Sequence, residues 1–327
     1  MRRTRSGIRT ALGALAGTTA LLASALATAG PASAEPAPSP VSSVQRPAQA
    51  KEFWTAERMR SAQPLDLLDV GKRAVDEVRE AVPGGEELTV PPSVGKGIGN
   101  ALPETGGSWT GGGEVVKTSG RVFFEYQGKQ ASCSGNAVTS DNASTVITAG
   151  HCVKMEGSWH KNWVFVPGYH DGQAPHGKWP ATKTLTTPQW EASEDMNYDV
   201  GAAVVQPQDG KRLTEAVGGQ GLAFNSGYGQ DMYAFGFPAA DPYDGEKLTY
   251  CSGTTFRDVL LTQDHAMSCD MTGGSSGGPW FTKFDESTGK GLQSSVNSFG
   301  YVFLPDTMFG PYFGDDAKAL YEKAQSA

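Results

Sequence analysis

The sequence has 327 residues with 27 basic and 35 acidic side chains, which give a formal net charge of −8. This acidic balance and the lack of any basic run argue against a nucleic-acid partner. After the first 34 residues no run of 18 apolar residues occurs, so the sequence predicts no membrane-spanning helix and no membrane partner.

Residues 1–34 have the pattern of an export signal. Four arginines without an acid precede an apolar, alanine-rich run, and an Ala-x-Ala cleavage site ends at Ala34. A transmembrane anchor is the weaker alternative, because threonines interrupt the run and Pro31 follows it. We therefore expect a secreted, extracellular protein. Loss of the signal would leave 27 − 4 = 23 basic residues against 35 acidic ones, a net charge of −12.

Residues 35–113 have the composition of a propeptide and linker. Residues 35–50 are rich in Pro, Ala and Ser, 51–82 are charged and helix-permissive, and 83–113 are rich in Gly and Pro. These stretches predict a partly disordered segment with a short helix and without a sizeable core. A flexible extension that is kept in the mature protein is the alternative.

Residues 114–327 predict an all-β sandwich or barrel, built on one core or as two small barrels. Short β-rich runs follow one another, separated by Gly, Asn, Asp and Pro, and no long helices alternate with them. Only the C-terminal end has a helical pattern, with Leu320, Tyr321 and Ala324 on one face.

The chain contains four cysteines, Cys133, Cys152, Cys251 and Cys269. In an exported chain an even number predicts two disulfides, for which three connectivities are possible. Pairing between sequence neighbours would close two loops of just under 20 residues, each contributing about 3 kcal/mol of stability. No Cys-x-x-Cys pair and no paired histidines indicate a metal site, so we expect no metal and no cofactor.

Three short motifs carry the residue types of a nucleophilic hydrolase. His151 lies in TAGHC, Asp199 opens the apolar run DVGAAVV, and Ser276 lies in GGSSGGP. A serine hydroxyl becomes a good nucleophile when an imidazole accepts its proton and a carboxylate orients that imidazole. Glycines around the serine let backbone N–H groups turn toward a developing oxyanion.

The order of the motifs excludes two other folds. GSSGG at 274–278 also fits the nucleophile elbow of α/β-hydrolases, but that fold places its histidine after the serine. Here all five histidines precede Ser276. The subtilisin order would need an acid from the loose segment before residue 114. Asp195 and Glu194 compete with Asp199 for the role of the acid, but neither opens an apolar strand.

The remaining histidines do not belong to these motifs. His160, His170 and His176 lie in a Gly-, Trp- and Pro-rich stretch and are predicted to be exposed. His265, beside Asp264, is predicted to lie in a turn.

TAGHC, DVGAA and GGSSGGP together resemble the three signatures of the chymotrypsin-like serine peptidases. Over nearly its full length the chain is similar to secreted trypsin-like peptidases of actinobacteria, a branch akin to the glutamyl endopeptidases. The resemblance implies two six-stranded antiparallel β-barrels with a C-terminal helix. It also implies a monomeric endopeptidase that cleaves proteins or peptides through an acyl-enzyme, with His151 as base, Asp199 as orienting acid and Ser276 as nucleophile.

The same resemblance assigns the substrate-binding backbone. The amides of Gly274 and Ser276 would form the oxyanion hole, and Ser298 to Gly300 would pair with the substrate, with Ser298 also approaching Asp199.

The resemblance also bears on the disulfides. A Cys133–Cys152 bridge matches the family's disulfide at the histidine loop, and Cys251–Cys269 has a less standard spacing.

One departure from the family pattern concerns the oxyanion loop. Ser275 replaces the acid that animal-type members pair with a newly formed N-terminus, so we expect the oxyanion loop to form without that ion pair. The propeptide would then assist folding or cover the cleft.

Specificity stays open. Asp270 lies six residues before Ser276, where trypsin-like enzymes carry the acid that receives Arg or Lys. Thr272 replaces a bracing cysteine, and Asn297 stands where glutamate-specific members tend to have a histidine. A preference for basic, glutamate or apolar residues therefore remains possible. The alternative to a peptidase is an esterase or a non-catalytic binding protein on the same fold, although none of the three motif residues is missing.

Overall fold

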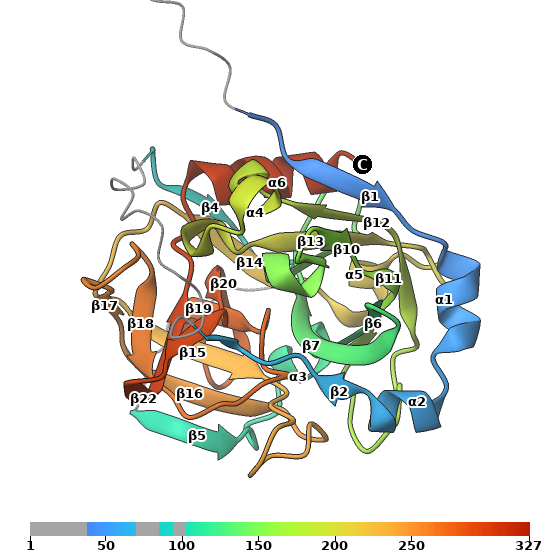
Figure 1. Ribbon diagram of the computed structural model, residues 1–327, viewed down its shortest axis with the longest axis horizontal. Helices are drawn as coiled ribbons and strands as arrows, with labels where there is room; N and C mark the ends of the chain where they lie inside the picture. The colour runs from blue at the N-terminus through green and yellow to red at the C-terminus, as the bar shows by residue number, and fades with distance from the viewer. Residues whose placement is uncertain (1–37, 70–84, 94–102) are drawn as a thin grey trace, which may run out of the picture. The chain divides into compact units, whose positions relative to one another are not determined.

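The computed structural model describes residues 38–69, 85–93 and 103–327, and antiparallel strands dominate them (Figure 1). The expected export signal lies outside the described residues. None of the helices in the described ranges is long and apolar enough to cross a membrane.

The first half of the β domain is a closed barrel of six strands. Its strands are β6 (Ser119–Tyr126), β7 (Lys129–Ala137), β8 (Thr145–Thr148), β11 (Lys161–Pro167), β12 (Trp179–Thr186) and β13 (Gly201–Val205). The order is β12-β11-β6-β7-β8-β13, and β13 pairs again with β12 to close the barrel. A two-residue turn joins β6 to β7, and both of its residues, Gln127 and Gly128, have positive φ, as tight hairpins favour.

The second half consists of two sheets. One contains β14 (Gly221–Phe224), β15 (Asp231–Gly236), β16 (Thr249–Thr254), β19 (Pro279–Asp285) and β20 (Lys290–Val296). The other contains β17 (Phe256–Arg257), β18 (His265–Ser268), β21 (Phe299–Tyr301) and β22 (Leu304–Gly310). Met232, Trp280 and Met308 pack together in the core of this half. The predicted all-β class is confirmed.

The shorter elements connect and cover these strands. They are α3 (Val115–Thr118), η1 (Gly150–Cys152), β9 (Lys154–Met155), β10 (Ser158–Trp159), α4 (Pro188–Ser193), η2 (Met196–Tyr198), α5 (Leu213–Val217) and α6 (Asp315–Gln325). The C-terminal helix α6 packs on the first half through Leu320, Tyr321 and Ala324, the face expected from the sequence.

Residues 41–69 pack against the domain, and the expectation of a loose, coreless segment is wrong for them. They form β1 (Val41–Val44), α1 (Pro47–Phe53), α2 (Ala56–Ser61), β2 (Gln63–Pro64) and β3 (Leu68–Asp69). Strand β1 adds to the edge of β12. Trp54 is fully buried against Phe123, and its Nε1 donates to the Asn162 carbonyl at 2.6 Å. The elements are too short to show a periodic pattern, and they bury apolar side chains only by contact with the barrel.

Two further short strands precede residue 113. Strand β4 (Leu88–Val90) pairs with β14, and β5 (Glu104–Ser108) pairs with β16.

Candidate active site

His151 and Asp199 lie at the same end of the first barrel. His151 is in η1, which follows β8, and Asp199 stands between η2 and β13. Because β8 and β13 pair, with Thr148 opposite Gly201, the two loops emerge side by side. Both side chains are fully buried.

Three donors converge on the Asp199 carboxylate. Oδ2 accepts from His151 Nδ1 at 2.7 Å and from Ser298 Oγ at 2.6 Å, and Oδ1 accepts from the His151 backbone amide at 2.7 Å. Since an ionised carboxylate can only accept, the proton of the neutral ring lies on Nδ1 and Nε2 is an acceptor. The ring is therefore held in the tautomer that a general base requires.

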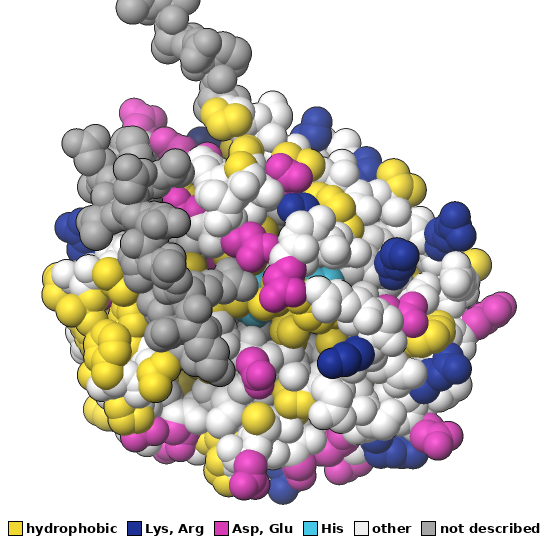
Figure 2. Space-filling model, viewed as in Figure 1, with side chains coloured by type: hydrophobic (Ala, Val, Ile, Leu, Met, Phe, Trp, Pro, Cys, Tyr) yellow, Lys and Arg dark blue, Asp and Glu magenta, His cyan; other side chains and the backbone are white. Residues whose placement is uncertain are grey.

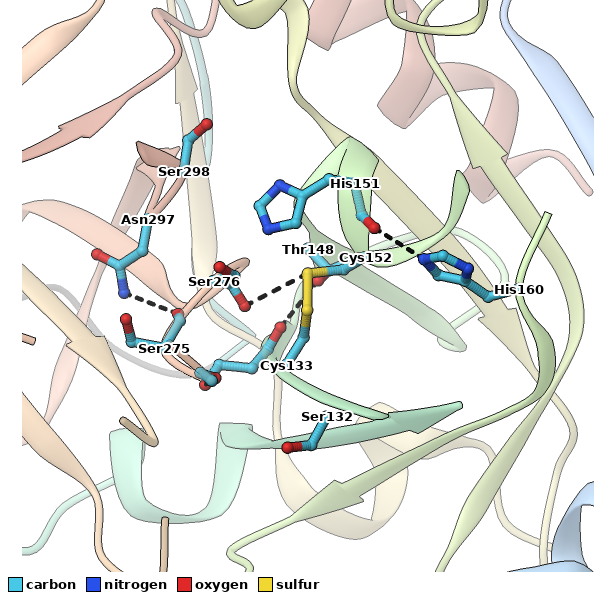
Figure 3. Close-up of a disulfide and its surroundings, with 12 residues drawn as sticks. Ser132, Cys133, Thr148, His151, Cys152, His160, Ser275, Ser276, Asn297 and Ser298 are labelled. Carbon is cyan, nitrogen blue, oxygen red and sulfur yellow. Dashed lines mark hydrogen bonds between the residues drawn. A yellow bond between two sulfur atoms is a disulfide. The ribbon is translucent and has the colours of Figure 1, made fainter. Parts of the chain in front are cut away.

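Ser276 faces this acceptor from the second half (Figure 3). It lies in the turn between β18 and β19 and is fully buried. Neither Ser276 Oγ nor His151 Nε2 has a hydrogen-bond partner within the described ranges. The Ser276 carbonyl accepts from the Ser134 amide at 2.7 Å and lies 3.6 Å from the sulfur of Cys152. The backbone of the serine is thus fixed to the first barrel.

Glycines in this turn are required by close contacts. Gly277 has φ +79°, and a Cβ there would lie 2.1 Å from Thr148 Oγ1 and 2.5 Å from the Ser134 carbonyl oxygen. A Cβ on Gly278 would lie 2.0 Å from the Phe235 carbonyl oxygen. Gly274 has φ +92°, and its amide donates to the Leu65 carbonyl at 2.9 Å. Because these glycines have no side chain, the turn can pack closely against both halves of the domain.

The Ser275 side chain points away from His151 (Figure 3) and stabilises the turn. Its Oγ donates to the Thr272 carbonyl at 2.7 Å. Asn297 Nδ2 donates to the Ser275 carbonyl at 3.0 Å, and Trp280 Nε1 donates to Asn297 Oδ1 at 2.6 Å. Hydrogen bonds between neutral groups therefore support the turn around Ser275. Animal-type members of the family have an acid at this position, paired with the N-terminus.

The four cysteines form two disulfides, as expected, and each joins the cysteines that are neighbours in the sequence. Cys133–Cys152 joins β7 to η1 beside His151 (Figure 3). Cys251–Cys269 joins β16 to the residue after β18.

His160 is buried, so its predicted exposure is wrong. Its Nε2 donates to the His151 carbonyl at 2.8 Å (Figure 3). Its ring stacks on Phe124 at a centroid distance of 4.3 Å. Burial lowers the pKa of His160 to about 3, so the ring stays neutral and supports the His151 backbone. Its surroundings in the sequence give no signal of this role, because the contact depends on strand pairing.

His265 is also buried, in β18 rather than in a turn, between Tyr228 and Tyr312. Burial lowers its pKa to about 4.

Asp264 is a buried acid near Asp199. It is fully buried, and neither carboxylate oxygen has a hydrogen-bond partner within the described part of the chain. Burial raises the pKa of Asp264 well above its usual value, and the nearby Asp258, Asp199 and Asp195 raise it further. Because the pKa of Asp264 is higher in the folded state than in the unfolded state, its protonated form contributes stability at pH values below the unfolded pKa. This contribution is lost as the pH rises through the folded pKa.

We therefore expect Asp264→Asn to stabilise the protein in a pH-dependent way. The melting temperature should rise at pH 8, by about 2–4 °C for each 1 kcal/mol relieved, and should change little near pH 3. Thermal unfolding at both pH values measures this, with the exposed Asp141→Asn as control. A melting temperature that falls at pH 8 would show that the Asp264 carboxylate is paired.

The expected substrate residues lie at the start of β21 and in the turn between β18 and β19. Ser298 donates its amide to the Phe309 carbonyl, and Gly300 is in β21. Asp270 is exposed, and its Oδ1 accepts from the Tyr243 hydroxyl at 2.6 Å. Its amide donates to the Thr105 carbonyl on β5.

Comparison with known proteins gives the family. Residues 133–288 match the model of the trypsin-like peptidase domain. The crystal structure of the protease Anisep from Arthrobacter nicotinovorans is 42% identical, with a TM-score of 0.63, and the match covers 68% of this chain and 100% of Anisep. The chain belongs to the trypsin-like serine peptidases.

Further relatives of this peptidase agree with the fold. The thermostable serine protease AL20 from an extremophilic microorganism is 40% identical, with a TM-score of 0.62 over 65% of this chain and 99% of AL20. A Glu endopeptidase shares the fold at 17% identity, with a TM-score of 0.55 over 68% of this chain and 98% of that chain. An extracellular metalloprotease of Bacillus subtilis (strain 168) is 29% identical over 166 residues, 44% of this chain. The peptidase spans about half the length of that curated relative, 52%.

The donor set near His151 does not fit a metal ion. Within the described ranges, one group of three His, Cys or acidic side chains lies close enough to share an ion, namely Cys133, His151 and Cys152. Both of its sulfurs are joined to each other in the disulfide and cannot act as thiolate ligands.

Proposed function

We propose that the protein is a secreted serine endopeptidase that forms an acyl-enzyme on Ser276. His151 Nε2 takes the proton of Ser276 Oγ as the oxygen attacks a peptide carbonyl, and Asp199 stabilises the imidazolium. The amides of Gly274 and Ser276 hold the oxyanion. His151 then protonates the leaving amine, and a water molecule releases the acyl group by the reverse steps.

One observation carries this proposal. A hydrogen-bonded series from Ser298 through Asp199 to His151 ends in a ring nitrogen that can only accept, beside a serine hydroxyl without another partner in the described part of the chain. Three donors fix the Asp199 carboxylate in position behind the His151 ring.

Labelling by a fluorophosphonate probe tests the nucleophile in the processed enzyme. Ser276→Ala should abolish labelling, and Ser275→Ala should retain it, because the Ser275 hydroxyl is bonded to Thr272. Labelling of the Ser276→Ala protein at Ser275 would reject the assignment.

The domain boundaries belong to the same proposal. Residues 1–34 would be the export signal, 35–113 the propeptide and 114–327 the peptidase domain. The two disulfides and the extracellular relative favour export. N-terminal sequencing of the secreted protein would locate both cleavage sites.

We further propose that Asp270 contributes to the choice of substrate, as the acid that receives Arg or Lys. Asp270→Ala should then lower kcat/KM for Arg-terminated substrates at least tenfold and leave Phe-terminated ones unchanged, because only a cation gains from the carboxylate. Assays with Arg-, Glu- and Phe-terminated peptides measure this. Undiminished Arg cleavage would remove Asp270 from the pocket.

We expect an apolar surface beside β21 to contact longer substrates. Exposed apolar side chains gather over β17, β18 and β22 (Figure 2), and they are Phe256, Val259, Leu260, Val302, Phe303 and Leu304. Extended substrates with apolar side chains would contact this surface.

A further inference from the structure

Residues 63–69 cross from the first half of the domain to the second, next to the turn that holds Ser276. Strand β2, at the start of this segment, lies beside β7 in Figure 1. On the first half, β2 pairs with β7, and the Leu65 amide donates to the Ser132 carbonyl at 2.9 Å. On the second half, β3 pairs with β21, and the Leu68 amide donates to the Ser298 carbonyl at 3.4 Å. The segment therefore forms backbone hydrogen bonds with β21, the strand that we expect to bind substrate.

The Leu65 carbonyl takes the place of a substrate carbonyl. Its oxygen accepts from the Gly274 amide at 2.9 Å, and that amide is one of the two proposed oxyanion donors. The following residue, Asp66, lies so close to Gly273 that a Cβ on this glycine would come within 3.1 Å of the Asp66 Cα. A substrate carbonyl cannot reach the Gly274 amide while the segment is in place.

Leucine side chains anchor the segment on the second half. Leu68 is only 3% exposed and packs in a cluster with Trp190, Phe299 and Tyr301. Trp190 lies beside His151, with ring centroids 6.2 Å apart. Because moving this buried apolar side chain into water is unfavourable, Leu68 anchors the segment.

Leu67 packs against a second cluster, which contains Cys269 and Met271 from the stretch before the serine turn. The two leucines thus occupy apolar surfaces on two sides of the proposed substrate strand.

The direction of the segment is opposite to that of a substrate. In a substrate the leaving amine follows the scissile carbonyl, and it must lie near His151 on the first half to receive a proton. Here the residues before the Leu65 carbonyl, Gln63 and Pro64, lie on the first half. The residues after it run along β21, and their pairing with β21 is parallel. The nitrogen of Asp66 is therefore on the wrong side for cleavage.

We propose that residues 63–69 are a built-in inhibitor that fills the active-site cleft in the reverse direction and keeps the precursor latent. The proposal rests on the proposed function, because it assigns the regulation of that same site. Full burial of His151 and Ser276 agrees with it. Activation then requires removal of the segment rather than insertion of a new N-terminus.

Labelling of the full-length chain by a fluorophosphonate tests the inhibitor, with intact mass confirming that the chain is uncut. Leu68→Asp places a charge in the apolar cluster and should accelerate labelling of Ser276 at least tenfold over the wild type. Val44→Asp is the matched control, since Val44 lies in the same N-terminal segment but is 81% exposed on β1. It should label at the slow wild-type rate.

Hydrogen exchange of the Ser276→Ala protein measures the contact between the Gly274 amide and Leu65 independently of the reaction at the serine. The peptide containing Gly274 should exchange at least tenfold faster in Leu68→Asp and at an unchanged rate in Val44→Asp. Equally fast labelling of all three full-length chains would overturn the inhibitor and leave the nucleophile intact. Absence of labelling in every variant, including the processed enzyme, would instead reject the proposed function, and the inhibitor with it.

Discussion

Asp199→Asn should lower kcat of the processed enzyme by about ten-thousand-fold, with little change in KM. Asp199 accepts from the His151 ring, the His151 amide and Ser298. An asparagine amide group facing Nδ1 would donate to it, which moves the ring proton to Nε2. The ring nitrogen beside Ser276 would then be a donor and could not take the serine proton. Steady-state kinetics with a peptide substrate measures the loss.

Ser298→Ala is the matched control for this effect. It removes one of the three donors but keeps the charge and the ring tautomer. A hydrogen bond to a charged group is worth about 1.5–3 kcal/mol, so we expect a loss of about 10- to 100-fold. Equal losses in Asp199→Asn and Ser298→Ala would contradict a specific role of the carboxylate in holding the tautomer.

Gly277→Ala should abolish activity and destabilise the fold by more than about 4 kcal/mol. The new Cβ would overlap Thr148 Oγ1, at 2.1 Å, and the backbone oxygen of Ser134, at 2.5 Å. Backbone on the opposite barrel cannot yield without separating the two halves, so Ser276 would lose its position. Urea unfolding and fluorophosphonate labelling measure the two effects.

Gly128→Ala separates the steric overlap from the backbone conformation. Gly128 has φ +77°, close to the +79° of Gly277, but nothing lies within 4 Å of a Cβ there. Gly128→Ala should lower the free energy of unfolding only by the strain of a positive φ, about 1–2 kcal/mol, and should leave the activity unchanged. If Gly128→Ala were as destabilising as Gly277→Ala, the tight contact would not explain the glycine at 277.

The sequence could predict those features that depend on short local patterns. Short β-rich runs gave the all-β class, and the neighbours of His151, Asp199 and Ser276 marked them as candidates. The structure brings Asp199 and His151 within 2.7 Å. The face of the C-terminal helix followed from the spacing of Leu320, Tyr321 and Ala324, because helical periodicity is visible within one segment.

Features that depend on contacts between distant residues could not be predicted. His160 supports His151 only because the intervening hairpin folds back, and nothing beside it in the sequence marks that contact. Residues 41–69 are polar and proline-containing, yet Trp54 and Leu68 are buried, since each finds an apolar surface on the domain. Such short elements gain their stability from the partner surface rather than from their own propensity.

The most direct test of the account is the location of the acyl group in a trapped intermediate. The processed enzyme would be mixed with an activated ester of a peptide, quenched in acid within milliseconds, digested and sequenced by mass spectrometry. The account predicts one acyl group per chain, on Ser276, which accumulates in the wild type and is absent from His151→Ala. An acyl group on Ser275 or on any other residue, or peptide hydrolysis by Ser276→Ala at the wild-type rate, would contradict it.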